Sequence, residues 1–490
     1  ITYTQLVEAG MNVGDVDPRT IKVTNRGREI PIYVAGEADG SFDPGDYIDF
    51  YGEPNLYQGP EEDQFKDPYS DVNVYWLSWG GSRGLRLVEE NGGITETNPF
   101  LYRQPHSYEY TVHAEEDNTY DRLRWATTTS DHWFWGEVGA NQLRSYSITL
   151  PKPDPNSIIP VRVRAMLHGK TYPPAYPDHH VLIYLNNALA ADTTWDGQTK
   201  CLVESETDIP SSYLQDGTNT LTLVCPGDTP AEEVDIIYLN WVEVTYPRLY
   251  RAQDDYLEFT IPQDWPGGLY QFVIGGFSRP EVEIYKRGTS KIVGFEVEYI
   301  EEEGFYQVTF QDSVLSSMVE YVALTPDRKL TPENIEADEP SELKSPTNGA
   351  DYLIITHENF YDYLQDLVDL RTAQGLTAQV VKTTDIYDEF NYGIFSPEAI
   401  RDFLRYAYEN WNPSPTYVLL VGDGTWDYKD HYGRGGNFVP VYPAYTYKWG
   451  RTSADHLYAC VSGDDLLPDL FIGRLPARTC LLYTSPSPRD

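Results

Sequence analysis

The sequence has 490 residues, of which 40% are hydrophobic and 14% aromatic, so it is too long for one ordinary core and has enough apolar surface to fold. Its formal net charge of −40 argues against nucleic-acid binding and against anionic lipid, because a strongly acidic surface repels phosphate groups. No CxxC pair occurs among the four cysteines, which excludes a common zinc site, and no apolar run approaches the ~20 residues that span a bilayer.

Residues 1–99 are expected to form a β-rich amino-terminal domain. The run TIKVTNRGREIPIYV predicts two strands flanking Asn25 to Arg28. The segment from Asp43 to Asp46, with sequence DPGD, predicts a turn, because proline fixes φ and glycine supplies a positive φ. No pattern in this segment predicts a helix of three turns. A strand, YIDFYG, is expected after the turn.

Residues 100–249 contain longer alternating runs and are expected to form a β-sandwich with a jelly-roll-like arrangement. The predicted strands are SYSITL, IPVRVRAML, HHVLIYLNN, NTLTLVC and DIIYLNWVEVTY. Trp125, Trp133 and Trp135 are either packing residues or a platform for glycan binding. Cys201 and Cys225 lie in or beside predicted strands, where they either pair or remain two free, buried thiols.

Residues 250–325 continue in short strands and predict a third, smaller β domain. Residues 326–349 are rich in Pro, Glu, Ser and Lys and poor in large apolar residues, which is typical of a linker. The main domain boundary is therefore expected there.

Residues 350–477 alternate between strand and helix patterns. Strands are predicted at 352–355, 378–381, 417–421 and 469–472, with a helix at 359–374 that is closed by Gly375. A second helix is predicted from its N-cap Ser396 and from Pro397 at the first position. Its apolar stripe consists of Ile400, Phe403, Leu404 and Ala407. Such alternation predicts a parallel, doubly wound α/β sheet.

Acidic residues follow the predicted strands of this α/β domain. Asp423 and Asp427 come directly after the strand at 417–421, and Asp464 and Asp465 precede the last strand. Ligands collect at the carboxyl ends of parallel strands, and clustered carboxylates are either solvated or bound to a hard cation. These four aspartates are therefore candidate ligands of a structural calcium ion, and no other cofactor is required.

Cys460 is the cysteine with a histidine nearby, because His456 lies four residues before it and His431 further back. A thiolate beside an imidazole would be a nucleophile. However, the surrounding YACV is apolar and predicts a strand, so a buried structural thiol is the expected state of Cys460. His357, at the start of the first helix, is expected to be a capping or surface residue.

The α/β segments resemble, in order and spacing, the opening of the gingipain-type cysteine peptidase domain. They are DYLIITH, RTAQGL, AQVV, DIYDEFNYGIFSPEAIRDFLRYAYENW, TYVLLVGDGTWDY and DDLLPDLFIGRLPA. The β-rich region, including FDPGDYIDFYGE, is similar to the amino-terminal region of large secreted family members. The resemblance implies a caspase-like fold, secretion or display at the cell surface, calcium in some members, and a His/Cys dyad acting on protein or peptide substrates.

In that family the dyad follows the strand that contains Ile-Gly-Arg, with histidine in a Gly-His-Gly context and cysteine in a later Ala-Cys context. Neither context occurs after that strand here, since the one Ala-Cys pair, Ala459-Cys460, precedes it, and residues 478–490 are expected to be non-native. The expected protein is therefore multidomain, with all-β modules followed by an incomplete α/β domain, and the chain as given is expected to be inactive. The alternative is a non-catalytic surface protein whose β modules serve adhesion or glycan binding.

Overall fold

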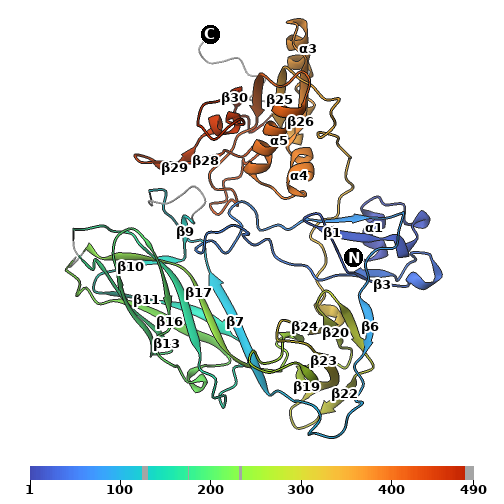
Figure 1. Ribbon diagram of the computed structural model, residues 1–490, viewed down its shortest axis with the longest axis vertical. Helices are drawn as coiled ribbons and strands as arrows, with labels where there is room; N and C mark the ends of the chain where they lie inside the picture. The colour runs from blue at the N-terminus through green and yellow to red at the C-terminus, as the bar shows by residue number, and fades with distance from the viewer. Residues whose placement is uncertain (124–130, 175, 231–233, 480–490) are drawn as a thin grey trace.

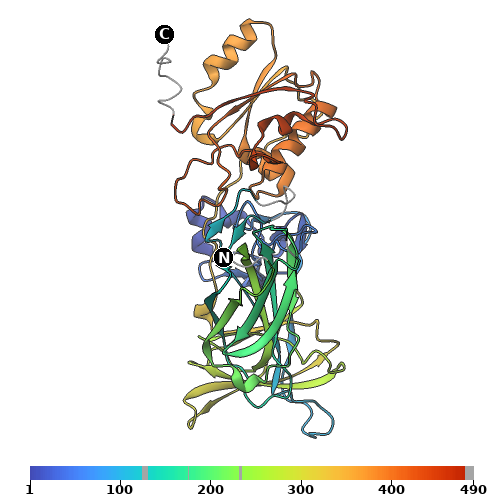
Figure 2. The same cartoon turned by 90° about the vertical axis from the view of Figure 1, so that its left-hand side faces the viewer.

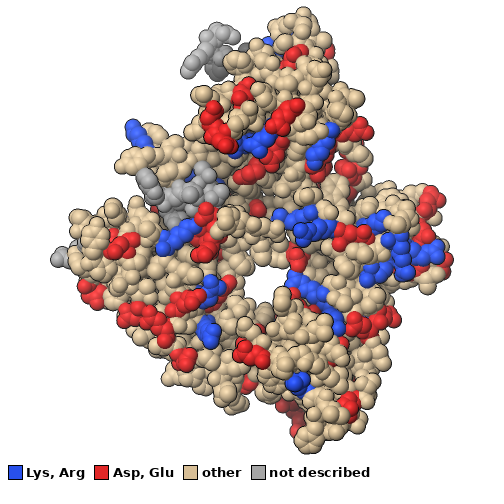
Figure 3. All heavy atoms as spheres, viewed as in Figure 1, with Lys and Arg blue, Asp and Glu red and all other residues tan. Residues whose placement is uncertain are grey.

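The computed structural model describes the chain except residues 124–130, 175, 231–233 and 480–490. Three β-rich units and one α/β unit are arranged around an opening that Figure 3 shows in the middle of the molecule. In Figure 1 the α/β unit lies at the top, the sandwich at lower left and the other β units at right and below. Among the described residues, no helix is both long and apolar enough to cross a membrane.

The amino-terminal unit is built from short elements around a small core. They are α1 (Tyr3–Glu8), β1 (Lys22–Asn25), β2 (Arg28–Ile30), β3 (Tyr33–Ala35), β4 (Tyr47–Asp49) and β5 (Tyr75–Ser78). The predicted strand pair around Asn25 to Arg28 is confirmed, because β1 and β2 pair antiparallel. The predicted turn before β4 is confirmed too: Gly45 has a φ of 110° and Asp46 N donates to Asp43 O at 2.9 Å.

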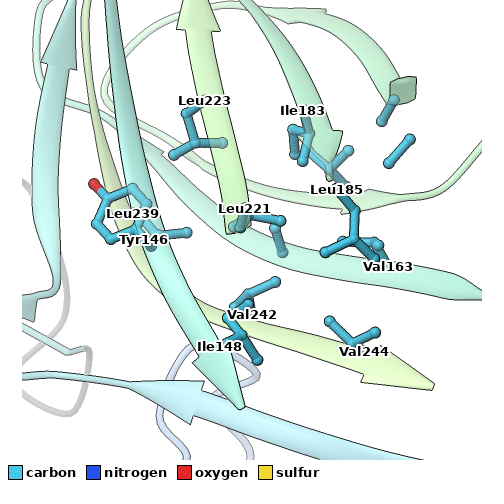
Figure 4. Close-up of a cluster of buried hydrophobic side chains, with 14 of the residues drawn as sticks. Tyr146, Ile148, Val163, Ile183, Leu185, Leu221, Leu223, Leu239, Val242 and Val244 are labelled. Carbon is cyan, nitrogen blue, oxygen red and sulfur yellow. The ribbon is translucent and has the colours of Figure 1, made fainter. Parts of the chain in front are cut away.

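The sandwich consists of two antiparallel sheets that enclose the largest apolar core (Figure 4). One sheet contains β7 (Ser107–Glu115), β10 (Gly136–Gly139), β12 (Arg162–Gly169), β15 (Lys200–Glu204) and β17 (Ile236–Leu249). The other contains β11 (Gln142–Leu150), β13 (His179–Leu185), β14 (Ala188–Trp195) and β16 (Gly217–Cys225). Buried side chains alternate along β16, as expected for a strand with one face in a core. The sandwich is thus established, whereas the jelly-roll arrangement stays a prediction.

The third β unit also has two sheets. One is ordered β18-β24-β20-β21-β6 and the other β19-β23-β22. The strands are β6 (Val88–Asn91), β18 (Tyr256–Phe259), β19 (Gly268–Phe277), β20 (Glu283–Lys286), β21 (Ser290–Val293), β22 (Glu296–Ile300), β23 (Phe305–Val314) and β24 (Tyr321–Leu324). Because β6 pairs parallel with β21, the first hundred residues supply one strand of this unit. A further small pair, β8 (Thr119–Tyr120) and β9 (Trp133–Phe134), lies beside the sandwich.

The segment 326–349 has the predicted linker composition but packs against its neighbours. Lys329 pairs with Asp49 of the amino-terminal unit at 2.6 Å. Leu343 is only 5% exposed and belongs to the core of the α/β unit. Its backbone N donates to Glu389 Oε1 at 2.6 Å, and its carbonyl accepts from Trp411 Nε1 at 3.0 Å. Lys329 and Leu343 thus anchor this mostly exposed segment to two units.

The α/β unit has a four-stranded parallel sheet in the order β26-β25-β27-β30, which confirms the predicted parallel pairing. Its strands are β25 (Tyr352–Thr356), β26 (Ala378–Lys382), β27 (Tyr417–Val421) and β30 (Phe471–Leu475). Its helices are α2 (Glu358–Tyr361), α3 (Gln365–Ala373), α4 (Thr383–Asn391) and α5 (Pro397–Asn410), and a hairpin joins β28 (Pro443–Thr446) to β29 (Gly450–Ser453). Figure 2 shows the helices on both faces of the sheet.

The helix predictions succeeded best where a cap and an apolar stripe coincide. Ser396 Oγ accepts from Glu398 N at 3.0 Å, and all four predicted core residues of α5 are fully buried. The single helix predicted at 359–374 is wrong, because the chain tightens after Tyr361 into i→i+3 hydrogen bonds and gives α2 and α3. Tyr363 and Leu370 in this segment are about half exposed.

Candidate functional site

Hydrogen bonds join the carboxyl ends of β25, β27 and β30, beside the loop that follows β27. Thr356 Oγ1 donates to Val421 O at 3.1 Å, which joins the ends of β25 and β27. Gly422 N donates to Leu475 O at 2.9 Å and joins the ends of β27 and β30. Gly422 has a φ of 143°, and a Cβ there would lie 3.0 Å from both Phe438 and Val439 side-chain atoms. Glycine is therefore required where this loop turns back over the sheet.

Arg474 is the main organiser of this edge. Its Nε and Nη2 form a bidentate pair with Asp455, at 2.6 and 2.8 Å. Its Nη1 donates to the carbonyls of Gly422 and Val439, at 2.9 and 2.6 Å, and its Nη2 donates to Pro440 O at 2.9 Å. A guanidinium has five N–H groups, and these five contacts match that number. One side chain thus ties β30 to both ends of the loop after β27.

Sequence reasoning missed the role of Arg474. The available signal was an arginine in an otherwise apolar strand, Ile472 to Leu475, since a buried guanidinium requires partners. Its partner Asp455 belongs to a short 3₁₀ helix, Asp455–Ala459, whose last two residues overlap the predicted strand YACV. The pairing depends on a contact across 19 residues, which local patterns do not encode.

The four candidate calcium ligands are engaged in different ways. Asp427 is buried and its two oxygens accept from the backbone N of His431 and Tyr432, both at 3.0 Å. Asp423 accepts from Gly424 N at 3.0 Å and from Arg478 Nε at 2.5 Å. Asp465 caps its own turn through Leu467 N at 2.9 Å, whereas Asp464 is exposed.

These contacts make Asp423 and Asp427 loop-fixing carboxylates in the described structure. Within the ranges that the structure describes, no group of three or more metal-ligating side chains comes together around a common point. The structure thus does not assemble Asp423, Asp427, Asp464 and Asp465 into one cluster, and the calcium site stays a prediction.

Cys460 is buried, as expected, but does not lie in a strand. It follows the 3₁₀ helix Asp455–Ala459, and its Sγ donates to the backbone carbonyl of His456 at 3.5 Å while the His456 side chain is exposed. The predicted strand is wrong because the hydrogen-bonding groups around it belong to turns: Asp469 N donates to Ala459 O at 2.8 Å. Burial raises the pKa of the Cys460 thiol, which disfavours the thiolate.

The other described thiols also lack catalytic partners. Cys201 and Cys225 are free, which settles the open pairing in favour of two unpaired thiols. Burial raises the pKa of both thiols. His357 caps α2 by accepting from Asn359 N at 3.2 Å, as expected, and burial lowers its pKa. In the described part of the chain, no thiol has an imidazole among its hydrogen-bond partners.

Residues of the β units contact the loop after β27 and fix its position. Trp426 stacks on Tyr120 at a centroid distance of 4.1 Å, and Trp133 lies 4.2 Å from the ring of His431. Lys429 pairs with Asp71 at 2.7 Å. The polar cavity at this junction has a volume of about 20 Å³, which holds one water molecule and no substrate.

The same contacts decide whether Trp133 and Trp135 are packing residues or a platform for glycan binding. Trp135 is 7% exposed and packs in the sandwich core, and Trp133 is covered by the loop of the α/β unit. Both are packing residues, so they offer no flat exposed platform for a glycan. Trp125 lies outside the described residues.

Comparisons with known proteins agree with this geometry. Residues 345–483 match the family model described as peptidase family C25. Gingipain R2 from two strains of Porphyromonas gingivalis, W83 and ATCC 33277, is 28% and 26% identical over 141 residues, which cover 29% of this chain and 16% of each relative.

A solved structure shares the fold over nearly the whole chain. The crystal structure of dimeric latent PorU from Porphyromonas gingivalis aligns with 98% of this chain at a TM-score of 0.64 and 16% identity. This chain covers 47% of that structure, so it spans less than half of the protein whose fold it shares. Together these findings confirm the resemblance: residues 345–483 match the model of peptidase family C25 and are similar to gingipain R2.

Proposed function

We propose that this chain is part of a secreted or surface-displayed gingipain-like cysteine endopeptidase, whose α/β unit has a caspase-like fold. The observation that carries the proposal is the C25 family match, which falls on a four-stranded parallel sheet in the order β26-β25-β27-β30. The parent protein would hydrolyse peptide bonds in protein or peptide substrates. In that reaction an imidazole activates a thiolate, which attacks the peptide carbonyl.

The dyad is proposed to lie downstream of β30, in Gly-His-Gly and Ala-Cys contexts that do not occur after β30 in this sequence; its one Ala-Cys pair, Ala459-Cys460, precedes that strand. The described thiols support this placement, because Cys460 bonds to a carbonyl and Cys225 lies in the sandwich core. A catalytic thiol and imidazole must approach within about 3 Å in an accessible cleft. The chain as given is therefore proposed to be inactive.

The test compares two proteins, the chain as given and a version extended by the downstream family segments. A mixture of fluorogenic peptides with different residues before the scissile bond is offered to both, with and without a thiol-alkylating reagent. Hydrolysis by the extended protein alone, abolished by the reagent, would support the proposal. Thiol-dependent hydrolysis by the chain as given, lost in Cys460→Ala, would overturn the placement of the dyad.

A structural calcium ion in the loops of Asp423, Asp427, Asp464 and Asp465 also belongs to this proposal. The position of these loops beside the sheet edge supports it, whereas the contacts of Asp427 to backbone N–H groups weigh against it. Calorimetric titration of the chain with calcium chloride tests whether the ion binds. No heat and no shift in melting temperature would remove it from the proposal. Glycan binding by the sandwich stays a prediction without a tryptophan platform.

A further inference from the structure

One end of the third β unit exposes five large apolar side chains. Phe100, Leu315 and Met318 are 92%, 87% and 88% exposed, and Leu101 and Trp265 are 61% and 39% exposed. They come from three connections, between β6 and β7, between β18 and β19, and between β23 and β24. Single exposed apolar residues are common on soluble proteins, but several at one place usually mark an interaction surface.

Strand pairing brings these three connections to the same end of the sheet. Arg103 lies beside the start of β19, because its N donates to Leu269 O at 2.9 Å and its carbonyl accepts from Gln271 N at 2.8 Å. On the other side of β19, Gly268 pairs with Val314 at the end of β23. Phe100 and Leu101, Trp265, and Leu315 therefore all lie just beyond the same strand ends. We call these residues with Met318 the apolar tip.

Local hydrogen bonds fix the backbone of the three turns that form the apolar tip. Asn98 accepts from Phe100 N through its side chain at 3.1 Å and from Leu101 N through its carbonyl at 3.0 Å. Ser316 does the same for Met318 N, at 3.3 Å, and for Val319 N, at 3.2 Å. Tyr270 OH donates to Pro266 O at 2.6 Å. The apolar side chains thus project from ordered turns and do not fold back on the sheet.

The apolar tip differs in charge from the rest of the molecule. Asp264 is the single charged residue in the segments 98–102, 264–268 and 314–319, although the whole chain carries a net charge of −40. The connection between β6 and β7 also lies at the end of the molecule farthest from the α/β unit (Figures 1 and 2). The tip is therefore a convex surface with few charges on an acidic protein, with Asp264 within it and the exposed Arg103 at its border.

We propose that the apolar tip docks on an electrically neutral lipid surface, with its side chains inserted at the level of the headgroups. Shape and charge favour this occupant. A convex tip of separate side chains suits a deformable bilayer, whereas a second copy would have to offer a matching hollow. Arg103 is the one basic residue at the border of the tip, and a single cation on a strongly acidic chain gives little attraction to anionic lipid, so the lipid is zwitterionic. Trp265 suits the boundary between headgroups and acyl chains.

The experiment uses the full chain and vesicles of phosphatidylcholine in a flotation assay. The test variant combines Phe100→Ser, Leu315→Ser and Met318→Ser, and the matched control combines Ile158→Ser and Leu330→Ser, which replace residues that are 98% and 94% exposed elsewhere. Wild type and control are expected to float with the vesicles. The test variant should partition on the order of tenfold less, because each serine removes a side chain that would enter the apolar boundary.

Several results would overturn the proposal: no flotation of the wild type, equal loss in the control variant, or binding restricted to vesicles that contain phosphatidylglycerol. Light scattering without lipid tests whether the tip binds a second copy of the chain instead. A dimer that the test variant abolishes, without vesicle binding by the wild type, would assign the tip to self-association and also overturn the proposal. The urea midpoint of each variant establishes folding, and Phe100→Ser alone replaces the triple variant if that midpoint falls. None of these outcomes depends on peptidase activity.

Discussion

The hydroxyl of Tyr69 donates a 2.6 Å hydrogen bond to Glu398 Oε1, although 329 residues separate the two in sequence. Ser396, the N-cap of α5, donates to the other carboxyl oxygen of Glu398 at 2.7 Å. Burial raises the pKa of this carboxyl, against these hydrogen bonds. A residue of the amino-terminal region thus completes the cap of a helix in the peptidase-like unit, so the β modules and the α/β unit stabilise each other.

Tyr69→Phe is expected to lower the free energy of unfolding by about 1 kcal/mol, because it removes one side-chain hydrogen bond and leaves a buried carboxylate oxygen without it. Hydrogen exchange should rise in the first turn of α5 and in the loop at 426–432, which packs on the same region. Urea denaturation and exchange mass spectrometry measure both effects. Tyr213→Phe, at a 51% exposed tyrosine, is the control and should change neither. Unchanged exchange in α5 would contradict the role given to Tyr69.

Arg474→Lys is expected to destabilise the α/β unit by about 2 kcal/mol or more, because lysine keeps the charge but cannot form a bidentate pair and reach three carbonyls. The loop from Gly422 to Pro440 should lose protection against hydrogen exchange first, since its two ends are held by this guanidinium. Arg434→Lys is a matched control, because that side chain is exposed and contacts the ring of Tyr432. Equal stability of the two variants would contradict the prediction.

The sequence predicted what short-range physics determines. Ser396 and Pro397 mark a helix start through their own hydrogen bonding and fixed φ, and the stripe of α5 follows from helical geometry, so this helix was found correctly. The parallel strands were found because each is a short apolar run between helix patterns. Their order in the sheet follows from packing.

The same reasoning failed where the partner lies far along the chain. Cys460 was placed in a strand because YACV is apolar, yet its neighbourhood is fixed by Arg401, which donates to the Cys460 carbonyl from α5 at 3.0 Å. α4 was missed because Thr383 to Asn391 has no capping side chain at its start, and tertiary burial of Ile386 and Tyr387 stabilises it instead. The hydrogen bonds of Arg474 likewise join residues that lie far apart in the sequence.

His180, in β13, is expected to make the stability of the sandwich depend on pH. Its Nδ1 lies 2.6 Å from Asp228 and its Nε2 lies 2.9 Å from Asp192. Burial alone would lower the pKa of His180, but the hydrogen bonds that its ring donates to these two carboxylates raise it. A histidine whose folded pKa is raised stabilises the fold fully below its unfolded pKa of about 6.5, and this contribution is lost as pH rises through the folded pKa.

His180→Gln should therefore lower the melting temperature more at pH 6 than at pH 9. The two curves of melting temperature against pH are expected to converge on the alkaline side. His456→Gln is the control, because that side chain is exposed. A constant difference between wild type and His180→Gln from pH 6 to 9 would show that the imidazole stays uncharged.

The burial of the thiols predicts their order of alkylation. Among the cysteines that the structure describes, Cys201 is partly exposed, whereas Cys225 and Cys460 are 0% and 2% exposed, and burial raises the pKa of these three thiols. Because the thiolate is the reactive species, iodoacetamide at pH 7.4 should modify Cys201 first and the other two only after local opening. Peptide mapping by mass spectrometry over time measures the three rates, and denaturation in urea should make them similar. An activated nucleophile would behave in the opposite way, with a depressed pKa and fast labelling in the native state. Preferential native labelling of Cys460 would therefore contradict its assignment as a buried structural thiol and reopen the question of activity in this chain.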